Sequence, residues 1–182
     1  MHGKPVRLRT PRDAIRHGIA LVPDERKAKG LVLNGSVLAN TALAGGRNRF
    51  FLRRAEERWR VGDWVQKLSI KVPGLDEPVM HLSGGNQQKI VLAKWLYAGA
   101  QVFLLDEPMR GIDIRAKSDI LDVIRELARG GAAVLMTSAD IEDLLGFADR
   151  IIVMHRGRIA GELSHGEATE EGIMHLATGA TR

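Results

Sequence analysis

The chain has 182 residues, of which 45% are hydrophobic and 27% charged, so it is long and apolar enough to fold around a core. Its net charge of +5 is unevenly spread: residues 1–80 hold 16 Lys and Arg against 8 Asp and Glu, and residues 81–182 hold 11 against 14. Aromatic residues, on which bases stack, make up only 4% of the chain. The basic half is therefore better explained as a solvated surface than as a nucleic-acid site. The absence of cysteine excludes disulfides and fits a reducing compartment, and neither a secretory signal nor an apolar run of about 18 residues occurs.

The first part of the chain combines a short helix, a strand and a longer helical region. A short helical pattern over residues 11–16 precedes the apolar run 19–22, which Pro23 ends, and the charged residues 24–30 are predicted to form a loop. Ser36 can cap a helix, and the pattern stays helical to about residue 68. The second helix of this region is expected to bury one face, tryptophan included: Ala55, Trp59, Gly62, Val65 and Leu68.

From Ser83 onward, strands and helices alternate. A helix over residues 86–98 ends near Gly99, and the apolar run 101–106 is typical of a strand buried on both faces of a parallel sheet. A helix over 115–129, a second buried strand over 132–137, a short helix over 140–148, a hairpin turning near residues 156–157 and a last helix after residue 166 follow. The inward residues of the helix over 115–129 are predicted to be Ile120, Leu121, Ile124, Leu127 and Ala128. This order predicts an α/β core with a mostly helical insertion between about residues 36 and 80.

Two acids end the first of these strands, in the stretch VFLLDEP. Asp106 and Glu107 stand at its carboxyl end, where open parallel sheets bind ligands. An aspartate there can hold Mg²⁺, and an adjacent glutamate can accept a proton from an attacking water. Acids at a strand end are also common as solvated residues, so the stretch alone leaves both interpretations open.

The stretch LSGGNQQK has the features of an anion site. Ser83 stands at a helix N-cap, and Gly84 and Gly85 let the backbone approach a bound group closely. The following helix directs its free amide groups and the positive end of its dipole at the turn. A capped helix without a ligand is the equally simple alternative.

Together, LSGGNQQK, one helix, VFLLDEP and GID resemble the ATP-binding domain of ABC transporters. With AIRHGIALVPDERKAKGLVL upstream, the wording resembles the second ATP-binding domain of tandem sugar-importer subunits of the ribose, xylose, galactose and inositol types, from Gly3 to about Leu176. The resemblance implies an α/β fold with a partial P-loop NTPase sheet core. It also implies one partial nucleotide-binding domain over residues 1–182, with a helical subdomain over 36–80 facing a membrane permease and the signature, Walker B and D-loop core over 81–182.

The resemblance also implies cofactors, partners and residue roles. ATP and Mg²⁺ are the implied cofactors, with Asp106 organising Mg²⁺ and Glu107 acting as the general base. Ser83, Gly84, Gly85 and Asn86 would contact the γ-phosphate of a nucleotide held by a second ATPase domain, and Asp113 would lie at the seam between the two domains. The chain would work at the cytoplasmic side of the membrane as a peripheral subunit, without nucleic acid.

Three departures from the family pattern are visible. Pro23 stands at the Q-loop glutamine, and Ser138 stands at the switch histidine, where a serine cannot carry a positive charge. The P-loop pattern G-x-x-x-x-G-K-[ST] is absent, since the only Gly-Lys is Gly3-Lys4. The resemblance places the missing block upstream and expects it to contribute a strand beside that of Asp106. A truncated gene, an internal start and a fragment of a longer chain are all open explanations.

Two functions compete with an ATPase component of a sugar importer. The first is a non-catalytic subunit that lends LSGG in trans to a partner with a P-loop. The second is a DNA-repair or chromosome ATPase, which shares LSGG but separates its motifs by long heptad coiled coils that this sequence lacks. The sequence does not identify the sugar.

Overall fold

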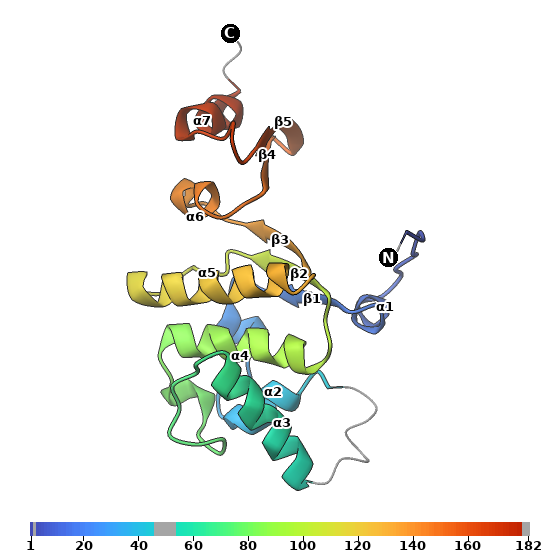
Figure 1. Ribbon diagram of the computed structural model, residues 1–182, viewed down its shortest axis with the longest axis vertical. Helices are drawn as coiled ribbons and strands as arrows, with labels where there is room; N and C mark the ends of the chain where they lie inside the picture. Colours follow the sequence, from blue (N-terminus) through green and yellow to red (C-terminus); the bar gives the residue numbers. More distant parts are fainter. Residues whose placement is uncertain (2, 46–53, 180–182) are drawn as a thin grey trace. The chain divides into compact units, whose positions relative to one another are not determined.

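The structure is a computed structural model that describes residue 1, residues 3–45 and residues 54–179 (Figure 1). The chain forms two compact units, residues 1–137 and residues 138–182. The first unit contains a parallel sheet with helices, and the second contains an antiparallel hairpin with two helices.

The parallel sheet has three strands in the order β1-β2-β3: β1 (Ile19–Val22), β2 (Val102–Asp106) and β3 (Ala133–Thr137). All three strands match the predicted apolar runs. β2 is the central strand and pairs with β1 on one side and β3 on the other. The expectation that the Asp106 strand lacks a neighbour is therefore wrong, because both of its edges are paired within the described residues.

The two faces of the sheet differ in burial. Val22, Phe103 and Leu105 are buried on one face, where α4 contacts β1 and α5 contacts β3. The other face presents Leu21 and Leu135, which are 54% and 61% exposed. The prediction of strands buried on both faces is wrong here, because an apolar run shows that a face prefers cover but not that the cover is present.

The helical region begins with α1 (Pro11–Arg16), η1 (Arg26–Gly30) and α2 (Val37–Ala42). Ser36 caps α2 as predicted, since its hydroxyl accepts a hydrogen bond from the amide of Ala39 at 3.1 Å. The charged segment expected to be a loop instead contains η1, a single π-helical turn.

The helix α3 (Arg54–Lys67) buries part of the predicted face: Val65 packs against the core and Leu68, just past the helix, is buried, whereas Ala55 is exposed. Trp59 is 70% exposed, whereas Val61 is fully buried and Trp64 packs against the core. The prediction for Trp59 is wrong because both faces have apolar residues at helical spacing, and the contacts with α2 and α4 select the one centred on Val61.

The helix α4 (Gly84–Tyr97) starts two residues earlier than predicted and follows the short turn η3 (Val79–His81). It ends as expected, with Gly99 in a left-handed conformation at φ +79°. It is buried on nearly all sides, not on one face: the buried residues are Gly85, Gln87, Gln88, Lys89, Ile90, Val91, Leu92, Ala93, Lys94 and Tyr97.

The helix α5 (Ile114–Arg129) lies beside α4 (Figure 1). Ile120 and Ile124 are fully buried, as predicted, but Ala128 is exposed. Ala128 belongs to the last turn of the helix, which extends past the part that packs.

The second unit consists of α6 (Ile141–Leu145), β4 (Arg150–His155), β5 (Arg158–Ser164) and α7 (Glu170–Thr178). The hairpin turns at Arg156 and Gly157 as predicted, and both have positive φ, as a tight two-residue turn requires. Ile151, Val153 and Ile173 form its core. Across both units, no helix within the described ranges is long and apolar enough to cross a membrane.

Candidate functional site

Asp106 and Glu107 lie at the carboxyl end of the central strand β2, beside Thr137 at the carboxyl end of β3. Register pairs Asp106 with Thr137, and the Thr137 hydroxyl donates a hydrogen bond to Oδ1 of Asp106 at 2.8 Å. The same hydroxyl accepts a bond from the Glu107 amide at 3.1 Å. Glu107 has φ +45°, a left-handed conformation that is unfavourable for a residue with a Cβ. Thr137 therefore fixes both the carboxylate of one acid and the backbone of the other.

Sequence reasoning did not single out Thr137. Its signal was present, because two predicted parallel strands that end at Asp106 and Thr137 can bring these residues side by side. The sequence of one strand does not determine its register against the next strand. A shift of β3 by one residue would place Thr137 on the other face of the sheet.

Asp106 is a single exposed carboxylate and cannot hold a metal by itself. The described residues contain no group of three or more His, Cys, Asp or Glu side chains placed to bind one ion. Mg²⁺ commonly takes one or two carboxylates, keeps several waters and completes its shell with substrate phosphates. The donor set at Asp106 therefore fits Mg²⁺ that arrives with a nucleotide.

The amino end of α4 begins at Ser83, which makes no side-chain capping bond to the helix. Regular helical bonding starts when the Gln87 amide donates to the Ser83 carbonyl at 2.9 Å. The amides of Gly84, Gly85 and Asn86 precede that bond, so they have no acceptor inside the helix. This end of α4 has the polarity that attracts an anion.

The orientation of the Asn86 amide follows from its two neighbours. Its Oδ1 accepts from the backbone amide of Lys71 at 2.9 Å, and a backbone N–H is always a donor. Its Nδ2 therefore faces the Ser83 hydroxyl and donates to it at 3.0 Å. Because Ser83 Oγ accepts this bond, its own hydrogen stays available for another acceptor. Asn86 thus prepares Ser83 as a donor.

The two glycines of the turn have close neighbours. A Cβ added at Gly85 would lie 2.5 Å from the Cβ of Ala116 on α5. A Cβ added at Gly84 would lie 2.6 Å from Nη2 of Arg26. Gly85 therefore requires glycine for close approach of α5, whereas a side chain at Gly84 would displace the Arg26 guanidinium.

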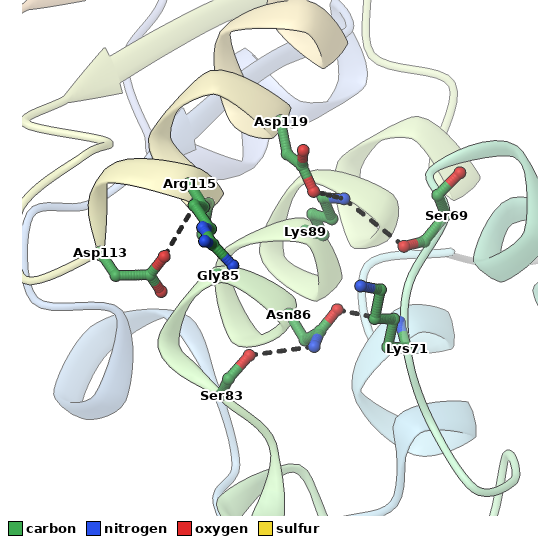
Figure 2. A pocket seen from close by; sticks show the side chains of 10 residues that line it. Ser69, Lys71, Ser83, Gly85, Asn86, Lys89, Asp113, Arg115 and Asp119 are labelled. Atoms are coloured by element: carbon green, nitrogen blue, oxygen red, sulfur yellow. Dashed lines mark hydrogen bonds and ion pairs between the residues drawn. The ribbon is translucent and has the colours of Figure 1, made fainter.

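A pocket of about 370 Å³ lies between the amino ends of α4 and α5 (Figure 2). It is lined by Ser69, Lys71, Ser83, Gly85, Asn86, Lys89, Asp113, Arg115, Ala116 and Asp119. Asp113 caps α5 by accepting a bond from the Ala116 amide at 3.0 Å. Lys89 pairs with Asp119 at 2.9 Å, and its side chain is only 5% exposed.

The pocket brings together four of the predicted site residues: Ser83, Gly85, Asn86 and Asp113. Gly84, Asp106 and Glu107 are not among its lining residues. The predicted residues thus form two groups, one at the amino ends of α4 and α5 and one at the end of β2.

A group of charged residues that sequence reasoning treated as a loop lies next to these sites. Asp24 accepts a hydrogen bond from Lys29 at 3.0 Å and forms an ion pair with Arg110 at 3.3 Å. The Lys29 bond is the main reason that the pKa of Asp24 lies below its ordinary value. Arg26 is half-buried, and this burial lowers the pKa of its guanidinium. The contacts of these residues reach more than 80 residues along the chain, which no local pattern reveals.

The two family departures occupy ordinary local structure. Pro23 follows β1 and has no side-chain donor or acceptor. The Ser138 hydroxyl accepts a bond from the Asp140 amide at 3.1 Å and donates to the Asp140 carbonyl at 3.2 Å. Ser138 is thus engaged with the backbone at the start of α6.

Comparison with known proteins identifies relatives of this chain. The family model described as "ABC transporter" matches residues 2–110. The chain is 48% identical over 180 residues to the ribose import ATP-binding protein RbsA of Rhodopirellula baltica, covering 97% of this chain and 35% of that protein. It is 46% identical over 182 residues to the arabinose import ATP-binding protein AraG 1 of Burkholderia thailandensis, covering 97% and 36%. The chain thus spans about a third of the length of these curated relatives.

Among solved structures, the fold is similar to that of cbiO1 from Clostridium perfringens, described as part of the ABC transporter complex cbiONQ. The TM-score is 0.71 and the sequence identity 24%, over 87% of this chain and 62% of that one. The likeness extends over most of the chain and shows that the two proteins share a fold.

Proposed function

The chain belongs to the ABC transporter family, and we propose that it is the ATP-binding and ATP-hydrolysing component of a carbohydrate importer. The cargo class rests on the relatives named as ribose and arabinose import ATP-binding proteins. The observation that carries the ATPase proposal is the end of β2, where one threonine fixes both the Asp106 carboxylate and the Glu107 backbone.

At the end of β2, Glu107 is the general base. Its carboxylate accepts a proton from the water that attacks the γ-phosphate, and its half-buried position limits competing solvation. Asp106 holds Mg²⁺ directly or through water, with its carboxylate oriented by Thr137. When bound, Mg²⁺ neutralises charge on the phosphates of ATP.

At the start of α4, the turn Ser83–Asn86 closes over a phosphate that another domain holds. The phosphates themselves are bound by the P-loop of a second ATPase domain, as the resemblance to ABC transporters implies. Ser83 supplies its hydroxyl hydrogen, and Gly84, Gly85 and Asn86 supply backbone amides. Asp113 lies at the seam between the two domains.

The remaining proposals concern the place of the chain in a transporter. The helical region 36–80 faces an integral membrane sugar permease, and the chain sits as a peripheral subunit on the cytoplasmic side of the membrane. The exposed Trp59, Leu43 and Met80 support a partner surface in this region, since they are 70%, 51% and 51% exposed.

A second candidate is a non-catalytic subunit that lends the signature turn to a partner. Ser138 favours it, because a hydroxyl bonded to the Asp140 backbone carries no positive charge to a phosphate. The signature turn of such a subunit would still act in trans.

Glu107→Gln distinguishes the two candidates, because it keeps the shape and removes the base. The chain is joined to an upstream P-loop block and paired with a second ATPase domain, and single-turnover phosphate release is measured together with ATP-dependent association. An ATPase component loses hydrolysis at this site by about 10²-fold or more and still associates. Glu126→Gln, on the exposed face of α5, is the matched control.

Unchanged phosphate release, with association that Ser83→Arg abolishes, would identify the non-catalytic subunit. A wild-type chain that shows no ATP-dependent association with P-loop domains would contradict both candidates.

A further inference from the structure

Arg26 joins two segments that are far apart in the sequence. Its Nη1 donates to the carbonyl of Arg110 at 2.8 Å, and its Nη2 donates to the carbonyl of Gly111 at 3.1 Å. These carbonyls belong to the loop between β2 and α5, which leads from Glu107 to Asp113. One guanidinium therefore holds two consecutive backbone groups of that loop.

The same guanidinium lies against the signature turn. A Cβ added at Gly84 would be 2.6 Å from Nη2 of Arg26 and 3.3 Å from the carbonyl of Gly111. The Arg26 side chain thus lies between the turn at the start of α4 and the loop after β2, next to both. Movement of the guanidinium would alter the spacing between the turn and the loop.

The base from which Arg26 extends is also fixed. The ammonium of Lys94 on α4 donates to the carbonyl of Gly30 at 2.7 Å, and Lys94 is only 7% exposed. At the other end of the segment, Asp24 pairs with Lys29 and with Arg110. Residues 24–30 are therefore anchored on both sides of Arg26.

We propose that Arg26 is a positioning residue that holds the signature turn and the loop after β2 in one fixed arrangement. Both segments can then meet the nucleotide of the partner domain together. This role rests on the proposed function, because it matters only where the turn and the loop act on one nucleotide. Arg26 touches no nucleotide itself and acts through Gly84, Arg110 and Gly111.

The alternative is an arginine that contributes to stability alone. Arg26→Lys separates the two roles, because lysine keeps the charge and most of the stem but lacks the planar fork that reaches two carbonyls. Lys27→Met is the control, since it removes a charge from the exposed neighbouring position of η1.

The first measurement is amide hydrogen exchange of the full chain without nucleotide, in peptides covering residues 83–86 and 107–113. Arg26→Lys should speed exchange in both peptides, and Lys27→Met in neither. Wild-type exchange in both peptides of Arg26→Lys would overturn the proposal. This measurement needs no partner domain, so it stands even if the proposed function fails.

The second measurement is ATP-dependent association with a P-loop-bearing domain. Arg26→Lys should weaken it by about 10-fold or more, as expected when two charge-assisted hydrogen bonds that order the docking surface are lost. Faster exchange with unchanged association would overturn the positioning role. Failure of the wild-type chain to associate would instead count against the proposed function.

Discussion

A side-chain contact between Thr137 and Asp106 ties the ends of the two parallel strands β2 and β3. The hydroxyl of Thr137 donates to Oδ1 of Asp106 at 2.8 Å and accepts from the Glu107 amide at 3.1 Å. A hydroxyl has one hydrogen to donate, and it is used on Asp106. The Thr137 bond uses Oδ1 of Asp106, so Oδ2 has no bond from this hydroxyl, and the left-handed Glu107 is held through its amide.

Replacing Thr137 should therefore impair chemistry more than folding. Thr137→Val keeps the shape but removes both bonds, and we expect phosphate release by the assembled ATPase to fall about tenfold or more, as for loss of one or two bonds to charged groups. Thr137→Ser keeps the hydroxyl and should retain most activity. Single-turnover assays over a range of Mg²⁺ concentrations check this, and equal rates for the Val and Ser variants would contradict it.

The orientation of Asn86 leads to a prediction with opposite signs for stability and function. Asn86→Asp replaces the donor Nδ2 with an acceptor, so the Ser83 hydroxyl donates its hydrogen to the new carboxylate. That hydrogen is then no longer available to bind a phosphate. The new negative charge also repels the phosphate. ATP-dependent association should weaken by about tenfold or more.

The same charge lies in the first turn of α4, where it favours the helix dipole by about 0.3–1 kcal/mol. The melting temperature of Asn86→Asp should therefore stay level or rise. Thermal unfolding measured beside association tests both signs, and a lower melting temperature with intact association would be the opposite of what we expect.

Gly85 should be intolerant of even one methyl group. Gly85→Ala would place its Cβ 2.5 Å from the Cβ of Ala116, so α4 and α5 must separate at their first turns. Overpacking of this kind destabilises by about 1–3 kcal/mol. Urea unfolding should show the loss, and Ala116→Gly in the same chain should restore much of it.

Gly74→Ala is the matched control, because an added Cβ there meets nothing within 4 Å. It should leave stability unchanged or raise it slightly, by about 0.4–1 kcal/mol. If Gly85→Ala were as harmless as Gly74→Ala, the close contact between α4 and α5 would be incorrect.

The ion pair of Asp24 and Lys29 should contribute to stability only between two limits of pH. The bond from Lys29 lowers the pKa of Asp24, so its contribution is present above the ordinary carboxyl value of about 3.9 and is lost as the pH falls below it. The same bond raises the pKa of Lys29, so the contribution is lost again above about 10.4.

Asp24→Asn should thus lower the melting temperature at neutral pH, and this deficit should shrink steadily as the pH falls below the ordinary carboxyl value of about 3.9. The difference should be small, because both groups are exposed to screening by solvent and salt. Glu25→Gln, which removes the same charge at the next position, is the control. A deficit for Asp24→Asn that persists in strong acid would show that its cause is not the ion pair.

The uncovered face of the sheet should make the isolated chain self-associate. Leu21, Leu104 and Leu135 align across the three strands, and the outer two are more than half exposed. Leu21→Ser with Leu135→Ser should reduce self-association in sedimentation experiments, because it removes apolar surface from this row. Ile114→Ser, at an 86% exposed position on α5, should not. A wild-type chain that stays monomeric at high concentration would contradict this expectation.

The helices and strands were predicted from the sequence better than the contacts that each of them makes. The runs that became β1, β2 and β3 and the turn at Arg156 and Gly157 were found because short apolar runs and turn residues act locally. The exposure of Trp59 on α3 was missed because Trp59 and Val61 both fit a helical stripe, and only packing decides between them.

The same distinction applies to the site. Ser83 and Asn86 are three residues apart in one motif, so their proximity could be predicted, and they do form a hydrogen bond. Thr137 required the register of two strands, and Arg26 required a contact across 84 residues. Neither can be obtained from one sequence, because no local pattern specifies how distant segments pack.

Burial around α4 limits how far its sequence can drift. A helix with one buried face accepts change on the other, as α5 should, since only Ile120 and Ile124 are fully enclosed there. In α4, ten residues are buried, including two glutamines and two lysines whose polar groups sit in the interior. A replacement there must match both volume and hydrogen bonding, so neutral variants of α4 should be rare along its whole length, whereas those of α5 should recur with a helical period.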